Sequence, residues 1–279
     1  MPHRTIYSII FLFFFLPPSF AQESPNSDST MLSEPSDLLM LSLSYTSNNM
    51  KTKNYEYDRI PAFLSDLNFF SKYGFIASLN YTNYYKATEN TYEAEAQIGY
   101  QKTLFNDFTI SSHYARRKFV GDTTYEGLAQ KNTLALDFAY NWKFLDLQIS
   151  NSYLNGKSDN YFLDLDLGIS LDFDNVLSKN DFVLFNPTIS ATFGTDYWVF
   201  QNLRPNVEHA VVNYLARHNF KSHQFEYQSI ILFVPLVYNI GDIGFMVNWY
   251  YSWPSAKLTK LSWRDQSGVL FSVFYTPKI

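Results

Sequence analysis

The segment from Tyr161 to Phe173 alternates between two kinds of side chain. From Leu163 onward, every second residue is leucine, isoleucine or phenylalanine, and aspartate, glycine or serine lies between them. Successive side chains of a β-strand point to opposite faces, so the segment has one apolar face and one acidic face. The alternation extends over eleven residues. A usual strand has about five or six residues, whereas a strand that crosses a bilayer needs about 9–11.

The same period of two recurs along the chain from Leu38. In the segment 91–103, for example, Ala94 and Ile98 share one face, while Glu93 and Glu95 share the other. We count twelve segments of this kind. The predicted strands are 38–47, 60–70, 74–85, 91–103, 107–118, 130–142, 145–155, 161–173, 182–194, 226–238, 242–253 and 268–277.

The connections between these strands alternate in length. Short links lie at 71–73, 104–106, 143–144 and 239–241, with 174–181 as a longer member of this class, and longer links lie between them at 48–59, 86–90, 119–129, 156–160, 195–225 and 254–267. A meander closed into a barrel has this rhythm, with short periplasmic turns and longer outer loops. The sequence therefore predicts an all-β fold: a closed, antiparallel, up-and-down transmembrane β-barrel of about twelve strands, with both termini on the short-turn side.

Composition narrows the function classes. Phe and Tyr are abundant, 26 and 22 of 279 residues, which suits strands and the aromatic girdles of membrane barrels. Cysteine is absent, so disulfides, zinc-thiolate sites, thiol nucleophiles and lipidation cysteines are excluded. The net charge of −5 argues against nucleic-acid binding, which favours a basic surface. No dinucleotide-binding, P-loop or zinc-protease motif occurs, and we expect neither a cofactor nor a metal.

The N-terminus has the features of an exported protein. Residues 1–21 combine a short basic start, an apolar run of eleven residues from Ile6 to Leu16, and Ser19-Phe20-Ala21 before a cleavage point, which predicts a secretory signal peptide. Residues 22–37 are polar and contain two prolines, which predicts a disordered leader. The barrel domain is expected to occupy residues 38–279.

The chain ends in a predicted strand in which Val269, Phe271, Val273 and Tyr275 share one face. This strand resembles the C-terminal β-signal of bacterial outer-membrane β-barrels, although many members end in Phe and this chain ends in Lys278-Ile279. The resemblance covers Leu38 to Ile279, rests on the pattern and identifies no subfamily. It implies a location in the outer membrane of a bacterial cell envelope, contact with outer-membrane lipid, and the barrel-insertion machinery as a partner that recognises the last strand.

A soluble secreted β-sandwich or lipocalin-like barrel is the structural alternative. Its core would be apolar and its outer face polar, whereas here the polar face is too hydrophilic to form a dry core. The apolar faces also end in tyrosine or tryptophan near the loops, as in membrane barrels. These aromatic residues are Tyr45, Tyr81, Tyr92, Tyr140, Trp142, Tyr153, Trp249 and Tyr251.

The polar faces carry more acids than bases. The acids predicted to point into the lumen are Asp66, Glu93, Glu95, Asp137, Asp164, Asp166, Asp172 and Glu226. The bases predicted beside them are His113, Arg117 and Lys143. Because acids raise the local cation concentration, one interpretation is a channel for small solutes that prefers cations, or a site for a basic solute. The other is a polar network that fills the barrel without flux.

Two alternatives to a channel remain open. Ser111 and His113 lie two apart on one strand, the spacing seen in some barrel hydrolases that act on lipids, and these residues are candidates for a lipid or lipopolysaccharide hydrolase. A histidine that only hydrogen bonds within the lumen explains the same residues. The third hypothesis is a structural or surface-binding barrel whose outer loops bind a partner.

The longest outer loop, 196–224, carries His209, Arg217, His218 and His223. A loop of this length is usually functional or disordered. It is expected to enter the lumen, cap the mouth, bind a ligand or remain solvated.

The tenth strand departs from the alternation, because both of its faces are apolar. The uniform register predicts that Ile230, Leu232, Val234 and Leu236 point inward and that Ile231, Phe233 and Val237 point outward. One interpretation is that something apolar, such as the loop segment 207–215, packs against the strand inside the barrel, and a bulge near Pro235 is the alternative.

Overall fold

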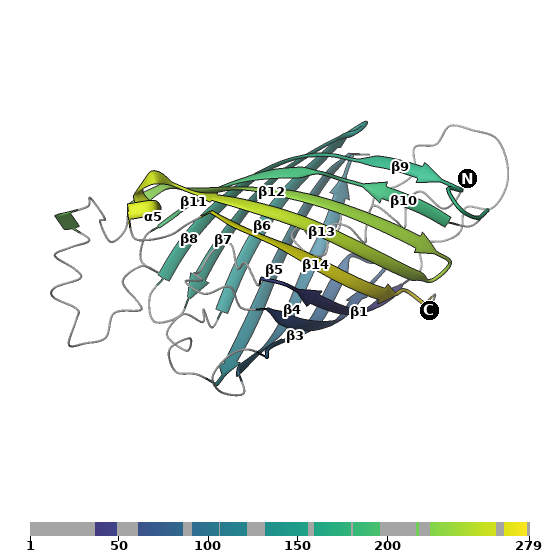
Figure 1. Cartoon of the computed structure of the whole chain (residues 1–279), viewed down its shortest axis with the longest axis horizontal. Coiled ribbons are helices and arrows are strands. Elements are labelled where there is room, and N and C mark those ends of the chain that lie inside the picture. The colour runs from purple at the N-terminus through teal and green to yellow at the C-terminus, as the bar shows by residue number, and fades with distance from the viewer. Residues whose placement is uncertain are drawn as a thin grey trace.

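The computed structural model describes residues 37–48, 61–85, 91–105, 107–121, 132–155, 159–179, 181–195, 216–217, 224–260 and 265–277. They form one antiparallel sheet of fourteen strand segments, closed into a barrel by the pairing of β11 with β12 (Figure 1). The segments are β1 (Leu38–Thr46), β2 (Ala62–Phe70), β3 (Phe75–Tyr84), β4 (Thr91–Leu104), β5 (Phe108–Val120), β6 (Asn132–Trp142), β7 (Leu145–Asn155), β8 (Asp159–Ile169), β9 (Leu171–Asp174), β10 (Asp181–Phe185), β11 (Thr188–Thr195), β12 (Phe225–Ile240), β13 (Ile243–Pro254) and β14 (Gln266–Tyr275).

Two strands of the barrel are each interrupted and therefore appear as two segments. Ser170 separates β8 from β9, and Asn186-Pro187 separates β10 from β11. Pro187 has no N–H to donate, and the neighbouring Asn186 reaches Pro235 O on β12 only at 3.4 Å. Counting each divided strand once gives twelve strands, so the predicted closed up-and-down barrel is confirmed.

Large apolar side chains cover the outward face of the wall. Leu43 on β1 is 69% exposed and Ile98 on β4 is 65% exposed, whereas Ser42 and Ser44, which flank Leu43, are buried. A soluble barrel would reverse this arrangement, because its apolar side chains belong inside. An apolar outer face and a polar interior are typical of a barrel surrounded by lipid.

Aromatic rings pack together near both ends of this outer face. Close to the long loops, Phe63 lies 5.3 Å from Tyr45 and 5.3 Å from Tyr85, measured between ring centroids. Close to the short turns, Phe75 lies 5.4 Å from Tyr100. Two such groups on either side of an apolar band are typical of interfacial aromatic girdles.

The two ends of the barrel differ. The helix α5 (Ala256–Lys260) lies at the end of the long loops, and β14 ends at the opposite end, where the short turns lie (Figure 1). Ser255 caps α5 by accepting a hydrogen bond from the N–H of Leu258, whose side chain is buried. The sequence predicted only a loop here. No helix among the described residues is long and apolar enough to cross a membrane.

A bulge in β12 overturns the inward and outward assignment predicted for this strand. Thr192 pairs with Ser229 while Phe193 pairs with Tyr227, so Gln228 is an extra residue. Beyond it the alternation is inverted: the inward side chains are Ile231, Phe233 and Val237, and Ile230 and Leu236 are exposed. The alternative placed a bulge near Pro235, and the observed bulge at Gln228 lies seven residues before it. The loop segment 207–215, the other explanation, lies outside the described residues.

An apolar cluster lies inside the barrel near the short-turn end. Its members come from β1, β10, β12, β13 and β14, and Leu64 of β2 packs against it, so it covers the inner face of six consecutive strands of the sheet. We refer to these buried residues as the apolar cluster: Met40, Phe182, Leu184, Val237, Met246, Leu270 and Phe274.

Inward aromatic rings lie over glycines of the neighbouring strand. Phe274 is paired directly with Gly244, and a Cβ atom on that glycine would overlap the Phe274 ring. Tyr250 covers Gly268 in the same way. The missing side chain lets each ring lie against the wall, which leaves more of the interior open.

Candidate functional site

Five polar residues lie directly opposite one another on five successive strands. Ser42 on β1 pairs with Asp66 on β2, Asp66 with Asn80 on β3, Asn80 with Glu95 on β4, and Glu95 with Arg117 on β5. Side chains of directly paired residues point to the same face of a sheet, so all five share the interior. We refer to this set as the polar row.

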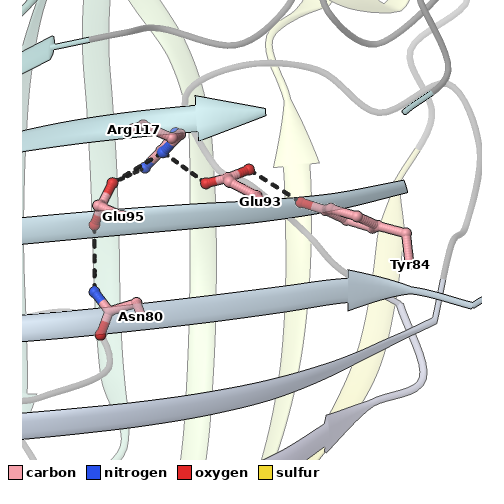
Figure 2. Close-up of polar contacts among 5 residues, drawn as sticks. All are labelled: Asn80, Tyr84, Glu93, Glu95 and Arg117. Carbon is pink, nitrogen blue, oxygen red and sulfur yellow. Dashed lines mark hydrogen bonds and ion pairs between the residues drawn. The ribbon is translucent and has the colours of Figure 1, made fainter. Parts of the chain in front are cut away.

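Hydrogen bonds connect members of the polar row. Ser42 Oγ donates to Asp66 Oδ2 at 2.7 Å, and Asn80 Nδ2 donates to Glu95 Oε1 at 3.4 Å. Arg117 donates to Glu95 Oε2 through Nε at 2.9 Å and through Nη2 at 2.6 Å (Figure 2). The two bonds from Arg117 to Glu95 join oppositely charged groups and are stronger than hydrogen bonds between neutral groups.

Arg117 also binds a second carboxylate. Its Nε lies 2.6 Å from Glu93 Oε1, and Tyr84 donates to the other oxygen of Glu93 at 3.3 Å (Figure 2). The side chains of Arg117, Glu93 and Glu95 are 23%, 9% and 15% exposed. Arg117 therefore compensates part of the negative charge of two largely buried glutamates.

A cavity of about 1260 Å³ lies in the interior along the polar row. All five members of the row line it, and Phe274 lines it from β14, where that residue pairs directly with Ser42. The cavity thus has a charged wall on β2 to β5 and borders the apolar cluster through Phe274. Its volume exceeds the range of about 300–1000 Å³ that is usual for small-molecule sites.

The structure brings Ser111, His113 and Asp137 together, but not as a nucleophile and its base. Ser111 Oγ donates to Asp137 Oδ2 at 3.2 Å, and His113 Nδ1 lies 3.6 Å from the same oxygen. A catalytic serine must instead hydrogen bond to the base that removes its proton. Ser111 is also buried, with 3% of its surface exposed. This arrangement favours a polar contact within the wall.

The remaining predicted acids have separate partners. Asp164 accepts a hydrogen bond from Thr192 at 2.8 Å. The strand register places Asp166 opposite Gln148 on β7 and opposite Ser190 on β11.

Glu226 lies near the long-loop end. It forms an ion pair of 2.8 Å with Lys257 of α5.

Two of the residues predicted in the lumen lie at the short-turn rim instead. Lys143 is exposed in the β6–β7 turn, with its Nζ 5.6 Å from the ring centroid of the exposed Trp142. The lumen assignment of Lys143 is wrong because Lys143 lies in the predicted turn 143–144, where it has a left-handed φ of 58°, and not on a strand face. Asp172 lies on β9, which continues past the β6–β7 turn and is exposed at every residue.

The outer-loop candidates cannot be placed in the same way. His209, His218 and His223 lie outside the described residues, and Arg217 is exposed in the short described piece 216–217. Within the described ranges, no three His, Asp or Glu side chains are placed to share a metal ion.

Sequence reasoning missed the neutral members of the site. Ser42, Asn80 and Tyr84 are ordinary polar residues until pairing places them beside charges. One signal was available: β4 and β5 form a tight hairpin, and counting back equally from its turn matches Glu95 with Arg117.

No family model matches the sequence, and no curated protein matches it. The fold is similar to that of a KdgM porin, with 12% identity, a TM-score of 0.48, and coverage of 85% of this chain and 98% of that one. It is also similar to LpxR from Salmonella typhimurium, with 7% identity, a TM-score of 0.49, and coverage of 85% and 99%. A NanC porin has 11% identity, a TM-score of 0.44, and coverage of 85% and 98%. At these identities the likeness concerns the fold alone.

Proposed function

We propose that this chain is a bacterial outer-membrane channel through which small solutes pass. The observation that carries the proposal is the cavity of about 1260 Å³ inside a closed barrel whose outer face is apolar. A barrel embedded in lipid with a polar, hollow interior offers a route that lipid itself does not. The signal peptide expected at residues 1–21 would direct export.

The cavity is proposed as the part of the route where solutes meet the protein. The adjoining wall, β10 and β12 to β14 with β1, carries the apolar cluster, whereas the polar row has space in front of it. Permeation therefore follows the wall formed by β1 to β5.

Single introduced cysteines test this route, because the natural chain has none. In Asn80→Cys, the thiol replaces a cavity-lining side chain, whereas Ile98→Cys places it on the outward face of the neighbouring strand β4, where Ile98 is 65% exposed and does not line the cavity. Folded protein in a planar bilayer should conduct ions, and a charged methanethiosulfonate reagent should reduce the current of Asn80→Cys only.

Two results would contradict the proposal. Absence of conductance from correctly folded protein would remove the channel. Equal effects of the reagent on the two cysteine variants would remove the route along the polar row. Heat-modifiable mobility on an unheated gel establishes that each variant has folded.

A further inference from the structure

The acids that line the cavity differ in how their charge is compensated. Glu95 receives two hydrogen bonds from Arg117, and Glu93 pairs with the same guanidinium. Asp66 receives one hydrogen bond, from the neutral hydroxyl of Ser42. Within the described part of the chain, no lysine, arginine or histidine pairs with Asp66.

A half-buried carboxylate without a cationic partner is unfavourable, because one neutral hydrogen bond replaces only part of the hydration that it has lost. Glu95 adds to this cost, since it lies close enough for its charge to act on Asp66. A cation in the cavity would compensate the charge of Asp66. No side chain among the described residues provides that cation for Asp66. For Glu95, in contrast, Arg117 provides a cation two strands away from Asn80.

The surroundings of Asp66 fit a particular kind of cation. Asn80 lies directly opposite, with an amide oxygen that can accept a hydrogen bond, and Ser42 lies on the other side. Phe274 borders the same cavity beside Ser42, but its ring packs in the apolar cluster and only 2% of the residue is exposed, so the wall that faces the cation is polar. An ammonium or guanidinium has several N–H donors and can reach both the Asp66 carboxylate and the Asn80 oxygen.

We propose that Asp66, with Asn80, forms a subsite for the protonated amine or guanidinium group of a small organic solute. The ammonium or guanidinium donates to Asp66 and Asn80, and the body of the solute occupies the cavity in front of them. This inference rests on the proposed channel function for the route by which the solute arrives. It assigns Asp66 a role distinct from that of Glu93 and Glu95, which hold Arg117.

Benzylammonium is the probe, because it carries a single ammonium on a small uncharged body. Benzoate and benzyl alcohol keep the ring and change the charge. Binding to folded protein in detergent is measured by calorimetry, and block of ionic current is measured in planar bilayers. The native protein should bind benzylammonium and be blocked by it, and neither benzoate nor benzyl alcohol should do so at the same concentration.

Asp66→Asn keeps the shape and removes the charge. It should raise the dissociation constant and the half-blocking concentration of benzylammonium about tenfold or more, because a charged hydrogen bond is lost. Asp146→Asn is the matched control: Asp146 is also a half-buried carboxylate with one neutral partner, Asn186 at 2.7 Å, and it does not line the cavity. Its benzylammonium affinity should equal that of the native protein.

Asn80→Lys gives an independent test that does not depend on Asp66→Asn folding. It places a tethered ammonium directly opposite Asp66 and should abolish benzylammonium binding. Unchanged affinity in Asp66→Asn or in Asn80→Lys would overturn the subsite, as would equally tight binding of benzoate.

The two proposals fail in different ways. A native protein that conducts ions but neither binds benzylammonium nor is blocked by it overturns the subsite and leaves the channel intact. A native protein that binds benzylammonium through Asp66 but conducts no ions supports the subsite and overturns the channel.

Discussion

The polar row and the apolar cluster are two solutions to filling the same barrel. On β2 to β5, short and charged side chains bind one another along the wall, and a cavity remains in front of them. On β10 and β12 to β14, aromatic and aliphatic side chains meet inside the barrel and leave Phe274 only 2% exposed. Phe274 belongs to both regions, since it packs in the cluster and lines the cavity.

The difference shows what keeps the interior hollow. Carboxylates and a guanidinium that bind within the wall need no partner from across the barrel, whereas apolar side chains are stabilised only by meeting other apolar side chains. A barrel of one kind alone would be either filled or costly in buried charge. Combining both gives a stabilised interior with an asymmetric space.

The largest effect is expected from Phe274→Ala. Removing a fully buried phenylalanine ring should lower the free energy of unfolding by about 4 kcal/mol, because it deletes apolar contacts and leaves a void. The same change should enlarge the cavity and raise the single-channel conductance. Denaturant titration of the barrel in detergent and bilayer recordings measure the two effects. A stable variant with native conductance would show that the cluster does not bound the route.

Arg117→Met tests the other region. Glu93 and Glu95 would lie side by side on β4 without their cation, and the free energy of unfolding should fall by about 3 kcal/mol. Adding Glu93→Gln and Glu95→Gln to this variant should restore most of the loss, because the buried charges are then removed as well. A loss below about 1 kcal/mol in Arg117→Met would mean that these ion pairs behave like exposed surface pairs.

Gly244→Ala examines the contact between the two regions. The new methyl group would overlap the Phe274 ring and push it away from the wall, which should cost about 2 kcal/mol and reduce conductance. In a Phe274→Ala background the same substitution should cost much less, and that double-mutant cycle is the control. Additive losses in the cycle would show that the ring does not depend on the glycine.

The fold follows from the sequence because the period of two specifies both the strands and their faces. What the period cannot reveal is a change of phase, and the extra residue Gln228 inverted the faces of the rest of β12. The period also cannot orient a side chain outside the strands, and Lys143, in the turn after β6, lies at the rim and not in the lumen.

The candidate site is only half determined by the sequence. Asp66 with Asn80 and Glu95 with Arg117 pair across tight turns, so counting from the turn gives their register. Ser42 with Asp66 and Asn80 with Glu95 pair across long loops, whose lengths do not fix a register. The cavity depends on all four pairings and on the position of the Phe274 ring, which only three-dimensional packing decides.

The direct pairing of the polar row has a geometric consequence. The row runs across the strands, and strands of a barrel tilt by about 35–45° from its axis. Ser42 lies in the middle of β1, whereas Arg117 lies three residues from the long-loop end of β5. The row therefore follows a helical path around the barrel axis. A molecule that passes from one side chain of the row to the next rotates about this axis as it advances along the axis.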